Sequence, residues 1–186
     1  NIVELSSSLD EIVPVRNDKF TVFTLGRICA QKQPKLFNDI ATLVPEAKFI
    51  WIGSGELENL LTAPNIEVTG WKPRKEALAI AKGANAFILC SQGEAIAFSL
   101  LESMYLKKLI LVSDVVGNKS VIQDGVNGYV CTTAEQYANC IKEAIKSFPS
   151  YLTERAYQDV LAKYNTDVMK KRYIDFYYEV IAGTYK

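Results

Sequence analysis

The chain has 186 residues, of which 49% are hydrophobic and 23% charged, a composition typical of one globular domain with its own core. Its 21 Lys and Arg residues balance its 21 Asp and Glu residues, so no net charge attracts nucleic acid, and we expect no such partner. It contains no histidine, which excludes within this chain any triad, zinc site or general base that depends on one.

Short apolar runs alternate with helical patterns along the chain. The runs lack polar alternation, which is typical of strands buried on both faces of a parallel sheet. They predict six strands, at 20–25, 47–52, 66–69, 86–90, 109–113 and 128–131. Helical segments are expected at 34–44, 57–62, 73–82, 98–105, 119–123, 134–148, 151–164 and 166–181.

This alternation predicts an α/β fold, a Rossmann-like doubly wound parallel sheet of about six strands with extra C-terminal helices. We expect residues 1–19 to form a connector, residues 20–148 the domain, and residues 149–186 helices that pack on it. Right-handed crossovers bring the loops that follow the strands to one edge of the sheet. Those loops contain Gly26 and Arg27, residues 53–55, Gly70 and Trp71, residues 91–97, and residues 114–117.

Residues 91–104, SQGEAIAFSLLESM, lead from a buried strand into a helix. Glu94 lies at the junction, and Glu102 shares a helical face with Phe98 and Tyr105. A carboxylate on an apolar face costs several kcal/mol unless it is paired. Because parallel-sheet proteins bind ligands at such junctions, we expect Glu102 to accept hydrogen bonds from vicinal hydroxyls of a sugar or ribose. The alternative is that Glu102 lies at the edge of a solvated face.

Other ligand motifs are incomplete. The Gly-Ser-Gly of residues 53–55 starts like a dinucleotide fingerprint, but Glu58 takes the third glycine position and would repel a pyrophosphate. The sequence has neither a Walker-type phosphate loop nor an Asp-x-Asp metal motif, so an anion would need cationic side chains and helix N-termini. Arg27 and Lys32 are the candidates. The alternative is that Arg27 packs across a strand end and Lys32 is solvated.

The cysteines and the apolar runs indicate the compartment. The four cysteines lack metal-site spacing, and Cys90 and Cys131 fall in or beside apolar runs, so we expect buried thiols in a reducing cytoplasm. No apolar run approaches the ~20 residues of a membrane span.

Four motifs in one order resemble the retaining glycosyltransferase family 4, whose GT-B enzymes have two facing Rossmann-like domains. The matching half is the C-terminal, nucleotide-sugar-binding domain, over residues 20–128 and more loosely over the terminal helices. The motifs are GRICAQK with Arg27 and Lys32, WIGSGE, Glu94 and Glu102 with seven residues between them, and SDVVGNKSVIQDGVNGYV.

The resemblance implies catalytic roles for three charged residues. Arg27 and Lys32 would bind the donor diphosphate and stabilise the charge that grows on it as the glycosidic bond breaks. Glu94 would contact hydroxyls of the transferred sugar and favour its oxocarbenium-like state.

The resemblance also implies a set of donor-binding residues. Glu102 would hold the ribose hydroxyls, and the main-chain N–H groups near Ile96, Ala97 and Phe98 would bind phosphate at a helix N-terminus. Trp71 and Lys72 would line the base pocket, although Trp71 fits a packing role equally well. The glycine turns at Gly26, Gly53 and Gly70 complete the set.

We therefore expect the donor domain of a retaining hexosyltransferase that uses a UDP- or GDP-sugar, with no metal or cofactor, in polysaccharide or glycan assembly. The sequence departs from the family where Ala95-Ile96-Ala97 replaces Gly-Phe-Gly and where Gln33 replaces Gly. The family's N-terminal acceptor domain is absent from these 186 residues. We therefore expect this chain alone to be inactive, and the whole enzyme to be cytoplasmic or peripheral at the inner face of the membrane through that domain.

Two other classes stay open. One is a non-catalytic module that derives from such a domain and binds nucleotide or docks to another protein. The other is a flavodoxin-like or regulatory α/β domain, in which Glu102 has no part in nucleotide binding.

Overall fold

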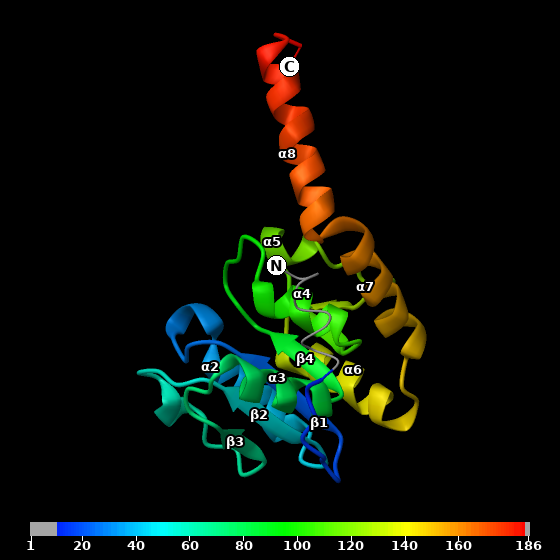
Figure 1. Cartoon of the computed structure of the whole chain (residues 1–186). Coiled ribbons are helices and arrows are strands. Elements are labelled where there is room, and N and C mark those ends of the chain that lie inside the picture. Colours follow the sequence, from blue (N-terminus) through cyan, green and yellow to red (C-terminus); the bar gives the residue numbers. More distant parts are fainter. Residues whose placement is uncertain (1–10, 185–186) are drawn as a thin grey trace.

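The computed structural model describes residues 11–184 and contains a parallel sheet of six strands in the order β3-β2-β1-β4-β5-β6 (Figure 1). The strands are β1 Thr21–Leu25, β2 Lys48–Ile52, β3 Ile66–Val68, β4 Ala86–Leu89, β5 Leu109–Ser113 and β6 Tyr129–Cys131. The sheet and its flanking helices confirm the predicted Rossmann-like α/β fold.

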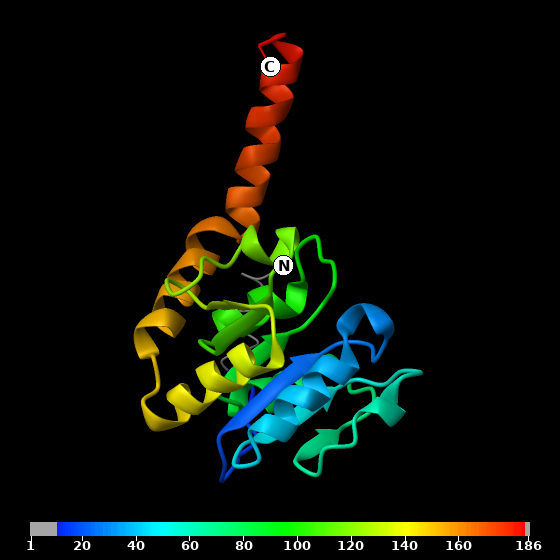
Figure 2. The ribbon, with the colours of Figure 1, turned by 180° about the vertical axis from the view of Figure 1, so that it is seen from behind.

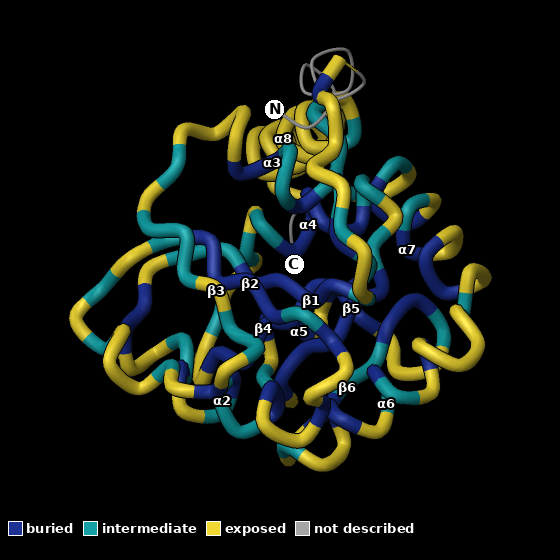
Figure 3. Tube along the Cα trace, turned by 90° about the horizontal axis from the view of Figure 1, so that it is seen from below, coloured by how far each residue is buried: buried dark blue, intermediate teal, exposed yellow. Residues whose placement is uncertain are grey.

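The inner strands are the most deeply buried part of the molecule (Figure 3). Every residue of β4 and β5 is buried, which explains why their sequences, AFIL and LILVS, lack polar alternation. Phe23 of β1 aligns with Ile50 of β2 on one side and with Phe87 of β4 on the other. The edge strands β3 and β6 have three residues each and are less buried.

Helices cover both faces of the sheet. On one face α2, Pro34–Leu43, and α6, Ala134–Lys146, bury Phe37 and Tyr137 in a core with the sheet. The other face is covered by three helices, α3 Arg74–Gly83, α4 Phe98–Tyr105 and α7 Ser150–Lys163. The remaining helices are η1 Ala30–Lys32, η2 Glu58–Leu60, α5 Val116–Lys119 and α8 Thr166–Ile181.

The two C-terminal helices differ in packing. Leu152, Ala156 and Val160 of α7 are fully buried against the body. By contrast α8 projects away from it, and none of its residues is buried (Figures 1 and 2). The expectation that the C-terminal helices pack on the domain is therefore not met by α8.

The expected connector lies partly outside the described residues, which begin at residue 11. Within the described part, Ile12 is buried beside Leu78 of α3, and the Val15 N–H donates to the Ala79 carbonyl at 3.1 Å. Residues 12–15 therefore run along α3 instead of standing clear of the domain.

Two further expectations about helices are wrong. The helix expected at 119–123 is α5, Val116–Lys119, which begins earlier, and its Gly117 packs against the backbone of the loop after β4. Phe98 was expected on the buried face of α4 but is 77% exposed, since it is the first residue of the helix and the apolar face is formed by Leu100, Leu101 and Met104.

The cysteines are thiols, as expected. Cys90 and Cys131 are free and buried, and burial raises the pKa of the Cys90 thiol well above its usual range. Neither is poised for nucleophilic chemistry at neutral pH.

Candidate functional site

The strand order reverses between β1 and β4. From β1 the sheet extends to β2 and β3 on one side, and through β4 to β5 and β6 on the other. Open α/β sheets bind ligands outside the carboxyl ends of the strands at such a point. The segments that follow β1 and β4 carry Lys32 and Glu94, so the topology brings these two predicted residues to the same place.

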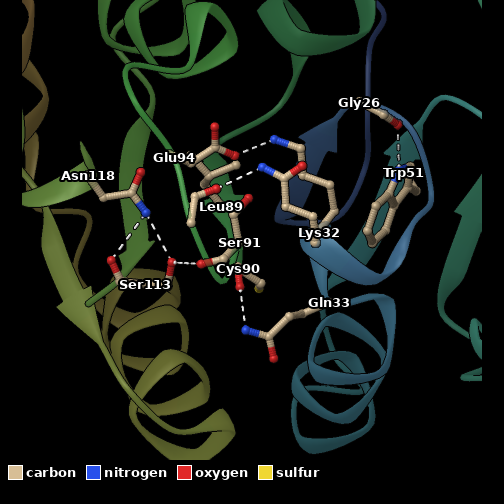
Figure 4. Close-up of polar contacts among 12 residues, drawn as sticks. Gly26, Lys32, Gln33, Trp51, Leu89, Cys90, Ser91, Glu94, Ser113 and Asn118 are labelled. Atoms are coloured by element: carbon tan, nitrogen blue, oxygen red, sulfur yellow. Dashed lines mark hydrogen bonds and ion pairs between the residues drawn. The ribbon is translucent and has the colours of Figure 1, made fainter. Parts of the chain in front are cut away.

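Lys32 and Glu94 form an ion pair at this edge (Figure 4). Lys32 ends η1, and its side chain is 20% exposed, while that of Glu94 is 11% exposed. Two hydrogen bonds tie the segments together, from Gln31 Nε2 to the Gly93 carbonyl at 2.8 Å and from the Gln92 N–H to the Gln31 carbonyl at 2.9 Å. The ion pair is thus held in place from both sides.

The glycine turns after β1, β2 and β3 lie against one another. The Gly26 N–H donates to the Ile52 carbonyl at 3.0 Å, and Gly53 pairs with Gly70 in an antiparallel bridge. A Cβ atom on Gly53 would lie 2.1 Å from the Gly26 carbonyl oxygen, and its φ is +145°. Glycine is therefore required at Gly53, and the three predicted turns form one continuous rim.

Buried polar groups support the Glu94 loop from below (Figure 4). Ser113 Oγ donates to the Ser91 carbonyl at 2.5 Å, and Asn118 Nδ2 donates to Ser113 Oγ at 3.0 Å. Gly117 packs so closely that a Cβ there would lie 2.0 Å from the Glu94 carbonyl oxygen. These contacts join α5 and β5 to the loop. Ser113 and Asn118 lie in the fourth sequence motif, but the sequence assigned them no contact because neutral side chains do not reveal their hydrogen-bond partners.

Glu102 is buried on α4, with 9% of the residue exposed. Its Oε1 accepts a hydrogen bond from Arg74 Nη2 at 2.5 Å, in an ion pair with the first residue of α3. The expected partner was a sugar hydroxyl, and the alternative of a solvated edge does not fit this burial. Arg74 was not among the predicted residues, since no motif marks it and it is 28 positions away from Glu102 in the chain.

Several predicted residues stand open to solvent. Arg27 is exposed, and its side chain makes no ion pair or hydrogen bond within residues 11–184. Trp71 and Phe98 are 76% and 77% exposed, and Ile96 is 46% exposed. Lys72 is half-buried. The structure therefore does not bring Arg27 into contact with the carboxylates, and the exposure of Trp71 contradicts the alternative of a packing role.

The N-terminus of α4 has no side-chain cap. Ala97 is its N-cap residue and has no group to accept from the first-turn N–H groups. Such an uncapped end attracts anions through its dipole and its free donors. The predicted phosphate contact near Ile96, Ala97 and Phe98 is consistent with this geometry.

A cavity of about 660 Å³ lies nearby, between the α5 segment and α7. Five of its six charged residues are paired, since Lys119 contacts Asp114 and Asp159 contacts both Arg155 and Lys163. The sixth is a carboxylate, Asp124, which accepts a hydrogen bond from the Val130 N–H. None of the predicted donor-binding residues lines it. All three cations of this lining are ion-paired, whereas at the strand-end site Lys32 is paired but Arg27 makes no ion pair within residues 11–184, so the strand-end site is the better candidate.

Fold and site together define a Rossmann-like domain of the GT-B glycosyltransferase type. The chain belongs to the family of glycosyl transferases group 1, which matches residues 7–159. Over 136 residues it is 26% identical to UDP-Gal:alpha-D-GlcNAc-diphosphoundecaprenol alpha-1,3-galactosyltransferase of Escherichia coli, a match that covers 65% of this chain and 35% of that protein.

Solved structures confirm the fold. The C-terminal domain of a group 1 glycosyl transferase, LpcC from Francisella tularensis, has a TM-score of 0.72 at 18% identity, covering 85% of this chain and 98% of that domain. HepE from Anabaena in complex with UDP-glucose has a TM-score of 0.77 at 17% identity, covering 96% of this chain and 52% of that protein.

The chain spans about a third of the curated relatives that it matches, 35% of one and 29% of the other. Among residues 11–184 no helix is long and apolar enough to cross a membrane. In the same range no group of three or more His, Cys, Asp or Glu side chains could hold a metal ion.

Proposed function

We propose that this chain is the donor-binding domain of a retaining hexosyltransferase, and that it binds a nucleoside-diphosphate sugar across the carboxyl ends of β1 and β4. The observation that carries the proposal is the Lys32–Glu94 ion pair at the point where the strand order reverses. The complex of HepE with UDP-glucose, a protein with the same fold, supports a nucleotide sugar as the ligand class.

In this proposal the site works through charge. Arg27 and Lys32 bind the diphosphate, and the uncapped N-terminus of α4 adds main-chain donors near Ile96, Ala97 and Phe98. As the bond to the sugar breaks, negative charge grows on the departing diphosphate, and these groups stabilise it. Because the diphosphate is a good leaving group, the donor side needs little general-acid assistance, and the family resemblance implies a reaction without a metal.

The two glutamates hold the sugars. Glu94 is turned toward the diphosphate site by Lys32, where it can accept hydrogen bonds from the transferred sugar and favour positive charge on its ring. Glu102 accepts from the ribose, Trp71 and Lys72 line the base pocket, and the turns at Gly26, Gly53 and Gly70 complete the donor site.

Isothermal titration of the 186-residue chain with UDP and with GDP tests the proposal. We expect heat of binding with at least one of them, and a loss of about 1–3 kcal/mol in binding free energy on Glu102→Gln, because a charged hydrogen bond is lost. Glu143→Gln on the far helix α6 is the control for the change in charge. A docking module would show no heat with either nucleotide, and in a flavodoxin-like or regulatory α/β domain Glu102→Gln would leave nucleotide affinity unchanged.

The rest of the proposal concerns the whole enzyme. An N-terminal domain would supply the acceptor site and any contact with the inner membrane face, and the product would enter polysaccharide or glycan assembly in the cytoplasm. These statements rest on the family resemblance, and the chain spans 35% and 29% of the length of the two curated relatives.

A further inference from the structure

Glu102 raises a problem of charge in a site for a diphosphate. Its side chain is only 11% exposed, and a carboxylate at that depth needs a compensating cation. Ribose hydroxyls can donate hydrogen bonds to it, but they bring no charge. A diphosphate bound nearby would add negative charge, so binding would place two anionic groups together in a poorly solvated region.

Arg74 supplies the missing positive charge. Its Nη2 lies 2.5 Å from Glu102 Oε1, and this is the one ion pair that Glu102 makes within residues 11–184. The contact uses a single oxygen of the carboxylate. Oε2 accepts no hydrogen bond from the described residues, so it stays available to a hydroxyl while Arg74 holds Oε1.

The position of Arg74 in its own helix points to the same role. It is the first residue of α3, after Pro73 at the N-cap. A cation there is unfavourable for the helix, because the N-terminal end of the dipole is positive. Arg74 therefore does not stabilise α3 through the helix dipole, and the carboxylate of Glu102 compensates for its positive charge.

The two elements in the pair come from different parts of the rim. Arg74 follows the β3 turn at Gly70, where the base pocket is predicted, and Glu102 lies on the helix that follows β4. Arg74 is half-exposed, with 52% of its side chain accessible, so it sits at the border of the site. The pair thus links the base side of the site to the ribose side.

We propose that Arg74 is a positioning residue for donor binding, which neutralises Glu102 and fixes its carboxylate so that one oxygen remains free for the ribose while a diphosphate binds beside it. The proposal rests on the proposed function. It also predicts that the ion pair between Arg74 and Glu102 persists when the nucleotide is bound.

A double-mutant cycle with UDP or GDP, whichever the wild-type chain binds, tests this role. Arg74→Gln should weaken binding of the nucleoside diphosphate by about 5- to 10-fold. The effect should be smaller than for a fully buried ion pair because the arginine is half-exposed. In the Glu102→Gln background the same substitution should change the affinity by less than about 2-fold, because no carboxylate charge is left to neutralise. Arg74→Lys should restore most of the affinity.

Lys75→Gln is the matched control. It removes one positive charge from the next position of α3, where Lys75 is exposed, and should leave the affinity unchanged. Titration with the uncharged nucleoside adds a second readout. Arg74→Gln should weaken binding of the nucleoside less than binding of the nucleoside diphosphate. A loss of folding alone would weaken both ligands equally, and thermal unfolding of each variant checks for it.

Each other outcome overturns the proposal. If Arg74→Gln lowered the affinity equally in the wild-type and Glu102→Gln backgrounds, Arg74 would contact the diphosphate directly or act only on the fold. Unchanged or tighter binding in Arg74→Gln would mean that the arginine competes with the ribose for Glu102. No binding by the wild-type chain would instead remove the proposed function, and this inference with it.

Discussion

At the scale of single residues, the rim of the site depends on Gly53. We predict that Gly53→Ala lowers the free energy of unfolding by about 2–4 kcal/mol, because the new Cβ would clash with a backbone oxygen in a conformation unfavourable for alanine. The clash is with the Gly26 carbonyl, 2.1 Å from the ideal Cβ position. The change in unfolding free energy can be measured by urea unfolding, monitored through tryptophan fluorescence. The buried Trp51 is a suitable probe because its indole N–H donates to that same carbonyl at 2.9 Å.

Gly93→Ala is the control in the neighbouring loop. Nothing lies within 4 Å of the Cβ position of Gly93, so its free energy of unfolding should change by less than about 1 kcal/mol. If the two alanine variants were equally stable, the rim would be looser than the structure indicates.

The residue scale also shows what sequence could predict about the site. Lys32 and Glu94 were identifiable because they are charged and follow strands that topology brings together. Arg74 was not, since its partner is 28 residues away and the pairing depends on how α3 packs beside α4. Gln33, where the family has glycine, adopts φ of 52°, and its amide donates to the Cys90 carbonyl at 3.0 Å, which offsets the conformational cost.

At the scale of elements, α7 is attached to the turn before β6 through Asp159. This buried carboxylate accepts hydrogen bonds from Asn127 and Arg155 and contacts Lys163. Burial raises the pKa of Asp159, but these donors outweigh it and hold the pKa below its usual value. Stability from Asp159 is therefore present above the unfolded-state pKa of about 4, and is lost as the pH falls through the lower folded-state value.

We predict that Asp159→Asn destabilises the chain by about 2 kcal/mol at pH 7, a moderate figure because Arg155 and Lys163 are half-exposed. The difference in unfolding free energy between the variant and wild type should shrink as the pH falls below about 4, the unfolded-state pKa, and through the lower folded-state pKa at which the native carboxylate takes up its proton. Chemical unfolding between pH 3 and 7 measures it. Glu154→Gln, on the exposed side of α7, should have little effect, and a pH-independent difference would contradict the assignment.

The two C-terminal helices, α7 and α8, should differ in their contribution to stability. No residue of α8 is buried, so a chain that ends at Asn165 should unfold within about 2 °C of the full chain. Removal of α7 as well should abolish cooperative unfolding, because Leu152, Ala156 and Val160 leave the core. Differential scanning calorimetry of both truncations gives the answer, and a large loss on removing α8 alone would reveal packing that these contacts do not show.

At the scale of the whole molecule, the fold class was predictable because the inner strands are apolar runs and strands alternate with helices along the chain. The two helical layers follow from right-handed crossovers on a parallel sheet, whereas the order of the strands was not predicted and comes from the structure. The path of α8 was not predicted, since the C-terminal helices were expected to pack on the domain, whereas α8 has no buried residue and leaves aromatic side chains such as Tyr173 and Tyr178 exposed.

The last prediction separates binding from transfer. With UDP- or GDP-sugar at 100 times its dissociation constant, the 186-residue chain should gain about 2.7 kcal/mol in stability, which raises its melting temperature by about 5–10 °C. It should nevertheless form no glycosidic product with added acceptor, because the groups described at the rim all serve the donor, and the chain covers only 35% of its E. coli relative. Thermal unfolding and product chromatography on one sample measure both, with Glu102→Gln as the variant that should show a smaller thermal shift at the same ligand concentration. Transfer at an appreciable rate would show that the acceptor site lies within this domain, whereas absence of a thermal shift would remove the donor site itself.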